Sequence, residues 1–423
     1  MGFTTVLPST PLGWTLFIIV LLLLIKAALT VTLATAHIWV RRRRARDWHG
    51  RDTPGVSVMI AAFNEEVGIA QTIRSVLAQD GPPLQVIVVD DGSTDRTAAI
   101  ADEFARRDAR VQVLRQANGG KASALNRAAA HLEYPVAVSV DADSSLAPGA
   151  LSALSRHFLN PAVGAVAGDV RVAGPVTSLT QMQHLEYSVG QQMDKRAQDM
   201  LGAVSVVPGA AGAFRTDLIR RLHYSGDTIT EDMDLTVAIA AAGYQVRFEP
   251  AALSFTEPPV TLPAMWRQRL RWMYGTFQVM GKYRHLILTA RGGRLGWLTL
   301  PYVLLYGLVL GGAGPLFDLA ALTLLVQQMS GGSAPPGALV PLLVSIGIDV
   351  LVAGVALALG RQSLRPLLIT PTQRLFMRPF VALVVIVTCL SFLRGRTVRW
   401  NKMPRVGVHL PGQPSPVAPQ AGD

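Results

Sequence analysis

The stretch Val136-Ala137-Val138-Ser139-Val140-Asp141-Ala142-Asp143-Ser144 decides how the chain is interpreted. Its first five residues predict a buried strand that is apolar apart from Ser139, and two carboxylates follow at its C-terminal end. Binding sites in open α/β sheets lie just beyond the C-terminal ends of strands. Mg²⁺ and Mn²⁺ usually take one or two protein carboxylates and complete their shell with phosphate and water. The pair therefore indicates a metal–diphosphate site, although an ordinary strand-to-turn Asp pair would share this pattern, since Asp favours turns.

The composition indicates a chain with a soluble part and a membrane part. It has 423 residues, of which 50% are hydrophobic and only 16% charged, and its formal net charge is +11. The mean hydropathy is +0.33, which is high for a soluble protein. Arginines bunched beside apolar runs are typical of the cytoplasmic edge of a membrane and argue against a nucleic-acid-binding protein. The single cysteine, Cys389, excludes an intrachain disulfide and a cysteine-based zinc site.

The first apolar run predicts a membrane anchor. Residues 12–40 are apolar except for Lys26 and His37, and four arginines follow at 41–44. A spanning helix needs about 20 apolar residues. A signal peptide is the alternative, because Ala34-Thr35-Ala36 resembles a cleavage site. No positive charge precedes the run, however, and the basic cluster follows it, so we expect an anchor with its C-terminal end in the cytoplasm.

Three more apolar regions come late, at 297–326, 339–360 and 375–393. The first is interrupted by Gly311-Gly312-Ala313-Gly314-Pro315, which predicts two short membrane helices or one kinked helix. Asp318 and Asp349 lie inside apolar runs, where acids usually face a bundle interior or a polar pathway; a place near the membrane edge is the alternative.

The topology stays open. The segments 361–378 and 394–405 are both basic, and both are cytoplasmic only if the last apolar region does not cross or the charge rule fails once. The Pro-rich end, 411–423, is expected to be disordered.

The middle of the chain alternates strand and helix signals, which predicts an α/β layer structure. Strands are expected at 56–62, 84–89, 111–114 and 136–140, with helices at 66–79, 96–107 and 121–131 between them. Three of these strands end in polar residues at one edge of the predicted sheet. A nucleotide across that edge would meet Glu65, Asp91 and the pair Asp141/Asp143. The loop Gly119-Gly120-Lys121 lets the backbone approach closely and supplies a cation for a diphosphate.

Together these motifs resemble the family 2 inverting glycosyltransferases of the GT-A fold. The membrane arrangement resembles the processive synthases of cellulose, chitin, hyaluronan and poly-N-acetylglucosamine. The matching pieces are Ala62-Phe63-Asn64-Glu65, Val89-Asp90-Asp91-Gly92-Ser93, Gly119-Gly120-Lys121, Asp141-Ala142-Asp143, Thr230-Glu231-Asp232, Gln268-Arg269-Leu270-Arg271-Trp272 and Trp400-Asn401-Lys402-Met403.

The resemblance implies roles for the donor-side residues. Asp91 would hold the uracil ring and Glu65 the nucleoside side. Lys121 would approach the diphosphate, and Asp141 and Asp143 the ribose and a Mg²⁺ or Mn²⁺ ion, with Asp143 the more direct metal ligand.

After Asp143 the chain changes character. A strand is expected at 163–172 and a helix at 181–198 carrying His184, Glu186 and Tyr187. The small residues of 205–214 suit a surface that a sugar approaches, or a flexible loop. Glu231 and Asp232 begin another expected helix, where acids are also ordinary capping residues.

Glycosyl transfer needs a base for the attacking hydroxyl. The resemblance puts that role on Asp232, beside Glu231.

Residues 265–283 predict an amphipathic interfacial helix, with Trp266, Leu270, Met273, Phe277 and Met280 toward lipid or protein. A basic helix lying on anionic lipid would explain its polar residues. The resemblance implies instead a substrate-binding motif with Gln268, in which Arg271 or Arg269 neutralises the leaving diphosphate and Trp272 stacks on the acceptor sugar.

We therefore expect a multi-pass inner-membrane enzyme of α/β class. Its parts would be an anchor with a basic segment (1–51), a cytoplasmic GT-A domain (52–256), interfacial helices (257–295), a membrane region (296–394) and a tail (395–423). It would transfer a sugar from a UDP-sugar, foremost UDP-N-acetylglucosamine and then UDP-glucose, onto a β-linked polysaccharide. A lipid-linked acceptor with single transfer and an inactive scaffold are the alternatives. Membrane lipid is an expected partner, and a second copy or a small membrane accessory protein is left open.

Overall fold

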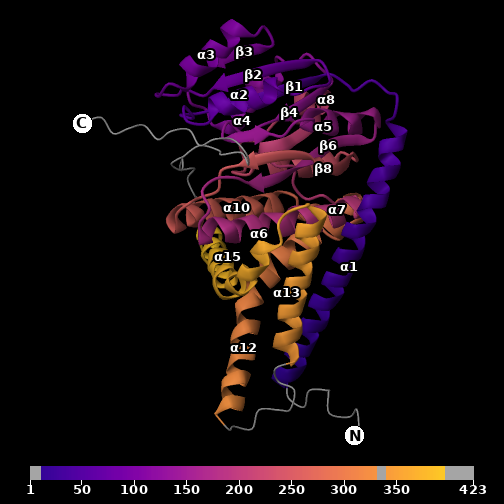
Figure 1. Ribbon diagram of the computed structural model, residues 1–423, viewed down its shortest axis with the longest axis vertical. Helices are drawn as coiled ribbons and strands as arrows, with labels where there is room; N and C mark the ends of the chain where they lie inside the picture. Colours follow the sequence, from indigo (N-terminus) through magenta and orange to yellow (C-terminus); the bar gives the residue numbers. More distant parts are fainter. Residues whose placement is uncertain (1–10, 331–339, 396–423) are drawn as a thin grey trace, which may run out of the picture. The chain divides into compact units, whose positions relative to one another are not determined.

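The computed structural model describes residues 11–330 and 340–395 (Figure 1). The tail motif 400–403 and the expected disordered end lie outside these residues. The described chain divides into two compact units. One contains 50–183 and 206–265 and is built around a sheet; the other contains the N-terminal helix, 184–205 and the chain from 266 on, and is helical. Residues 184–205 thus pack with the helices, although they fall inside the sequence range expected for the catalytic domain.

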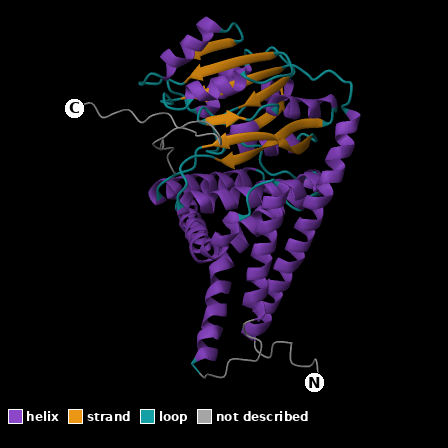
Figure 2. Cartoon of the chain, in the orientation of Figure 1, coloured by secondary structure: helices purple, strands orange, loops and turns teal. Residues whose placement is uncertain are grey.

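The sheet unit has eight strands among the described residues, in the order β3-β2-β1-β4-β7-β6-β8-β5. Figure 2 shows them with helices packed on the sheet. The strands are β1 Val56–Ala62, β2 Leu84–Asp90, β3 Val111–Arg115, β4 Val136–Ser139, β5 Ser144–Leu146, β6 Val163–Val172, β7 Gly212–Arg215 and β8 Gln245–Thr256. The helices are α2 Ile69–Leu77, α3 Thr97–Arg107, α4 Lys121–Ala129, α5 Ala150–Ser155, α8 Thr216–Leu222 and α9 Glu231–Ala241.

The first four strands in this order are parallel, which confirms the expected α/β core. Val58, Val88 and Val138 are fully buried, as expected for central parallel strands that are covered on both faces. Beyond β4 the sheet becomes mixed, since β7 runs antiparallel to both β4 and β6. The small-residue segment expected at 205–214 is not an open loop: Gly209–Ala211 forms one 3₁₀ turn and leads into β7, and its residues are buried.

Helix α2 begins three residues later than the sequence pattern suggests, at Ile69 instead of Glu66. The backbone N–H of Glu65 donates to the Thr97 hydroxyl at 2.7 Å, and that of Glu66 to the Asp95 carboxylate at 3.3 Å. Side chains of another loop thus satisfy these N–H groups, and the chain between β1 and α2 stays a turn.

The helical unit consists of α1 Pro11–Asp47, the end of α6 Ser178–Val189, α7 Arg196–Leu201, most of α10 Leu262–Lys282, α11 Leu300–Tyr302, α12 Gly311–Met329, α13 Val340–Leu359, α14 Thr370–Thr372 and α15 Arg378–Leu393. A π-helical segment, η3 Gly190–Lys195, joins α6 to α7. Within the described ranges, three helices are long and apolar enough to cross a membrane: 17–47, 342–359 and 365–393. A pair bent by 45°, 295–309 with 314–327, passes the same test, which fits the kinked alternative for this region.

The two polar residues inside the first apolar run have partners in this unit. Lys26, His37 and Arg44 are 11 and 7 residues apart, so a helix of 3.6 residues per turn places all three on one face. The buried His37 ring lies 2.9 Å from the Asp199 carboxylate, and Arg44 donates to the same carboxylate at 2.7 Å. Lys26 lies 3.9 Å from Asp194. Helix α1 therefore has a polar stripe that docks on η3 and α7, in addition to its apolar surface.

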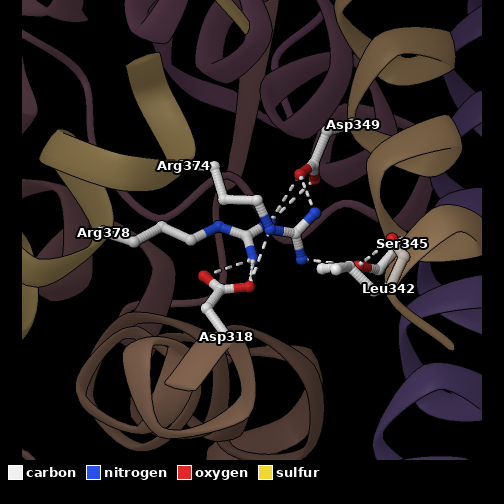
Figure 3. Close-up of polar contacts among 6 residues, drawn as sticks. All are labelled: Asp318, Leu342, Ser345, Asp349, Arg374 and Arg378. Carbon is white, nitrogen blue, oxygen red and sulfur yellow. Dashed lines mark hydrogen bonds and ion pairs between the residues drawn. The ribbon is translucent and has the colours of Figure 1, made fainter. Parts of the chain in front are cut away.

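Asp318 and Asp349 are paired with two arginines (Figure 3). Arg374 donates to Asp318 at 2.7 Å, to Asp349 at 3.0 Å and to the Ser345 hydroxyl at 2.5 Å. Arg378 donates to both oxygens of Asp349, at 2.8 and 2.7 Å, and contacts Asp318 at 3.3 Å. This set of four charges, here called the membrane ion cluster, joins α12, α13, the π-helical turn η10 Gln373–Met377 and the start of α15. The two acids thus face other helices of the unit.

Candidate active site

Three parallel strands end at one edge of the sheet and bring together residues that are far apart in sequence. β1 pairs with β2 on one side and with β4 on the other, in register from Val56 with Leu84 and Val136. The residues that follow Ala62, Asp90 and Ser139 therefore share this edge, as the sequence predicts. This edge of the sheet unit carries backbone N–H groups, carboxylates and the Lys121 ammonium.

The loops after β1 and β2 are hydrogen-bonded to each other. Asn64 has a left-handed backbone (φ +56°), an uncommon conformation outside glycine, and its side-chain oxygen accepts from the Thr94 N–H at 2.7 Å. The Asn64 N–H donates to the Ser93 hydroxyl at 2.9 Å. Together with the bond from the Glu65 N–H to Thr97, these contacts hold the largely buried Glu65 at the sheet edge.

The Asp91 carboxylate accepts hydrogen bonds from the loop after β3. One of its oxygens accepts the Gly119 N–H and the Gln116 side-chain amide, both at 2.8 Å, and the other accepts the Gly120 N–H at 2.9 Å. These bonds order the glycine loop that precedes Lys121, a role that the sequence motif does not reveal. The neighbouring Asp90 is also buried, and its Oδ1 has no hydrogen-bond partner among the described residues.

Lys121 is the first residue of α4 and connects two parts of the candidate site. Its Nζ lies 2.7 Å from Oδ1 of Asp141 and 3.0 Å from Oε1 of Glu231. Burial lowers the pKa of Lys121, but the carboxylates of Asp141, Glu231 and Asp232 outweigh this effect and raise the pKa well above its usual range. Lys121 is therefore a permanent cation, and Glu231 is an ion-pair partner here as well as the first residue of a helix.

Asp232 has the electrostatic surroundings expected of a base near neutral pH. Burial and the adjacent Glu231 carboxylate raise its pKa to about 6, while Lys121 and the Met233 N–H, which donates to Oδ1 at 2.8 Å, act in the opposite direction. An acid with this pKa is largely ionised at pH 7 and can still accept a proton from a hydroxyl group.

Asp143 follows Asp141 two residues along the chain, with Ala142 between them. Its side chain is 9% exposed, and its Oδ1 lies 3.3 Å from the Ser144 hydroxyl. The carboxylates of Asp141 and Asp143 carry hard oxygen donors of the kind that Mg²⁺ and Mn²⁺ bind. Among the residues that the structure describes, no group of three or more His, Cys, Asp or Glu could hold a metal ion. Two carboxylates suit an ion that takes its other ligands from a diphosphate and water.

Three further residues shape the site, and motif reading did not single them out. Gly209 lies against the ion pair: a Cβ at this position would stand 2.6 Å from Nζ of Lys121 and 2.9 Å from Oδ1 of Asp141. The Asn126 side chain, also on α4, makes two 2.8 Å hydrogen bonds to the backbone of Tyr224. The pKa of the buried Tyr224 phenol is raised above its usual range, mainly by burial and then by Glu231. Of these three residues, only Gly209 was indicated by the sequence, as part of the small-residue segment 205–214.

The residues of the Gln268–Trp272 motif belong to the helical unit. Gln268 and Arg269 are buried, and Arg269 donates to Glu186 at 2.8 Å. Its guanidinium lies 4.4 Å from the centre of the Trp272 ring, which in turn packs 6.5 Å from Tyr187. The apolar face of α10 packs on α15, through Trp266 against Phe380 and Phe277 against Phe392. For these two aromatic residues the neighbour is protein, which was one of the two alternatives.

Known proteins share this architecture. Residues 54–275 match the family model described as glycosyltransferase like family 2. A poly-beta-1,6-N-acetyl-D-glucosamine synthase from Staphylococcus epidermidis is 32% identical over 228 residues, which are 53% of this chain and 55% of that protein. A Staphylococcus aureus protein of the same name is 31% identical over the same lengths. The match thus spans about half the length of these curated relatives.

A solved structure extends the similarity in fold. The mannosyltransferase from Pyrobaculum calidifontis, in complex with GDP-Man and Mn²⁺, superposes with a TM-score of 0.55 at 21% identity, covering 83% of this chain and 99% of that one. The match over residues 54–275 contains the loops after β1 and β2, the Asp141/Asp143 pair and the Glu231–Asp232 helix start described above. The chain belongs to glycosyltransferase family 2.

Proposed function

We propose that this protein is an inverting glycosyltransferase that extends a β-linked polysaccharide at a membrane, using a UDP-sugar, foremost UDP-N-acetylglucosamine. The observation that supports this most is the group in which Lys121 joins Asp141 to Glu231, directly beside Asp232. It combines groups suited to a diphosphate with a carboxylate suited to accept a proton. The relatives named as poly-N-acetylglucosamine synthases support the choice of sugar.

The reaction uses these residues as follows. The acceptor hydroxyl attacks the anomeric carbon opposite the diphosphate, the new C–O bond forms as the bond to the diphosphate oxygen breaks, and the configuration inverts. Asp232 takes the hydroxyl proton, and UDP leaves with the bond electrons. Positioning and charge neutralisation contribute most of the acceleration.

Lys121 provides a cation for the diphosphate, and Arg271 or Arg269 a second one. Trp272 stacks on the acceptor sugar in this proposal, and Gln268 belongs to the same substrate-binding motif.

Asp141 and Asp143 would hold the Mg²⁺ or Mn²⁺ ion. When bound, the ion neutralises charge on the diphosphate leaving group. Glu65 and Asp91 belong to the nucleoside side. We propose Asp90 as an additional acceptor for a base N–H, because its buried Oδ1 has no partner among the described residues and a buried acceptor without a partner is costly.

We place the protein in the cell membrane as a multi-pass protein with the sheet unit in the cytoplasm. The three candidate spans and the arginines at the end of α1 support this arrangement. Membrane lipid surrounds these helices in the proposal.

The test is UDP release by the detergent-purified full chain with Mn²⁺, over a panel of UDP-sugars and GDP-mannose. The Asp232→Asn variant serves as comparison, and product length is measured by gel filtration. We expect one UDP-sugar to be turned over into a ladder of lengths, with a loss of about 10²–10⁴-fold in the variant. A single product of fixed size would favour single transfer to a lipid-linked acceptor. Nucleotide binding without turnover under any condition would favour the inactive scaffold.

A further inference from the structure

The ammonium group of Lys121 is held by carboxylates from two parts of the sheet unit. It lies between Asp141, which follows β4, and Glu231, which begins α9, at 2.7 and 3.0 Å. The Lys121 side chain as a whole is 34% exposed. Its position depends on the ordered loop before it, because the Asp91 carboxylate binds the N–H groups of Gly119 and Gly120.

Gly209 limits where this ammonium can move. A Cβ at Gly209 would come within 2.6 Å of Nζ and within 2.9 and 3.3 Å of the two Asp141 oxygens. The backbone of the 209–211 turn therefore covers the Lys121–Asp141 pair closely on one side. Nζ of Lys121 and Oδ1 of Asp141 are 2.7 Å apart, and this turn lies against both of them.

A cation in this position competes with a metal ion for the same carboxylate. An ammonium at 2.7 Å neutralises most of the attraction that Asp141 would exert on a divalent cation, and the two positive charges would also repel each other. A diphosphate changes this balance, because its oxygens attract both the ammonium and the metal.

We propose that Lys121 masks Asp141 in the absence of nucleotide, so that the protein binds a divalent cation tightly only together with a nucleoside diphosphate. This inference rests on the proposed function for the identity of the nucleotide. On donor binding, Lys121 transfers from Asp141 and Glu231 to the diphosphate. The same exchange removes the ion-pair partner of Glu231, next to the proposed base, and so links occupation of the donor site to the acceptor side.

The test is a titration of the full chain in detergent with Mn²⁺ alone, followed by electron paramagnetic resonance of the unbound ion. Lys121→Met is compared with wild type, and Lys121→Arg retains the charge. Arg110→Met is the matched control, because it also removes one positive charge from the sheet unit, where Arg110 pairs with Asp108 at 2.8 Å. Thermal unfolding of each variant identifies a protein that has not folded.

We expect Lys121→Met to bind Mn²⁺ about tenfold more tightly than wild type without nucleotide, and to bind UDP more weakly when Mn²⁺ is present. Lys121→Arg and Arg110→Met should match wild type with Mn²⁺ alone. Equal Mn²⁺ affinity in Lys121→Met and wild type would overturn the proposal. A gain in Mn²⁺ affinity in Arg110→Met as large as that in Lys121→Met would also overturn it, because the gain would then come from the lower net charge of the protein.

A second variant keeps the proposal testable if Lys121→Met does not fold. Glu231→Gln leaves Asp141 as the carboxylate partner of Lys121, so its Mn²⁺ affinity should not rise. A rise of about tenfold would contradict the masking of Asp141. None of these titrations requires turnover. A wild-type protein inactive on every donor would therefore argue against the proposed function and leave the masking result intact.

Discussion

The pKa of Asp232 predicts how the rate depends on pH. With a pKa of about 6, raised by burial and by Glu231, this carboxyl group is about nine-tenths ionised at pH 7 and about one-tenth ionised at pH 5. If the ionised form is the base, kcat/KM should fall about tenfold between these pH values. The sign follows from the raised pKa: activity is present above pH 6 and is lost as the pH falls through it.

The measurement is initial UDP release from pH 4.5 to 8 at constant ionic strength and low donor concentration, so that the free protein is observed. Samples returned from pH 5 to pH 7 must regain full activity, which separates titration from unfolding. In Lys121→Arg, which keeps a positive charge near Asp232, the acidic limb should stay near pH 6. A profile that is flat between pH 5 and 7, or a limb near pH 4, would refute the assignment of Asp232 with this pKa as the base.

Three further changes test other parts of the structure. Gly209→Ala should lower kcat by on the order of tenfold to a hundredfold without loss of thermal stability, because the added Cβ displaces the flexible end of Lys121 by steric overlap; wild-type rates would contradict this. Asp91→Asn places an amide N–H group where a carboxylate oxygen accepts loop N–H groups, so hydrogen exchange over 116–121 should accelerate and the KM for the donor should rise; unchanged exchange would show that the loop orders itself. Arg378→Met should lower stability in detergent by on the order of 2 kcal/mol, and Arg378→Met combined with Asp349→Asn should recover part of it; a loss in the double variant equal to the sum of the losses in Arg378→Met and Asp349→Asn would indicate that the pair is not coupled.

The sheet edge was predictable because strand ends have a strong sequence signal. The apolar run before Asp141 and those before Glu65 and Asp91 predicted parallel strands, and the structure confirms their register. What a carboxylate binds was not predictable. Asp91 was expected to face the uracil, and that role remains a proposal; its oxygens accept loop N–H groups from residues 28 and 29 positions away.

Contacts between residues that are far apart in the chain could not be predicted from the sequence. Neither the closeness of Gly209 to Lys121 nor the hydrogen bonds of Asn126 to Tyr224 follow from local pattern, because both depend on how α4 packs against later parts of the chain. The contact of His37 with Asp199, 162 residues away, likewise does not follow from the local sequence pattern.

The membrane ion cluster changes how the charge rule applies to the last apolar region. The basic segment 361–378 was expected to be a cytoplasmic loop, but Arg374 and Arg378 lie within the candidate span 365–393 and bind Asp318 and Asp349. Only Arg361 and Arg365 then remain to favour the cytoplasmic side. The conflict between this segment and the basic tail is correspondingly weaker.

The order of these four charges along the chain has a consequence for biogenesis. Asp318 is synthesised 56 residues before Arg374, and Asp349 is synthesised 29 residues before Arg378. At a helix centre in the bilayer, an acid without a counter-ion costs about 2.5–3.5 kcal/mol on insertion scales. During translation, the carboxylates of α12 and α13 therefore leave the ribosome before the arginines that pair with them. We expect α12 and α13 to insert stably into the lipid only after residue 378 has emerged. The helices of the C-terminal membrane region would then insert together.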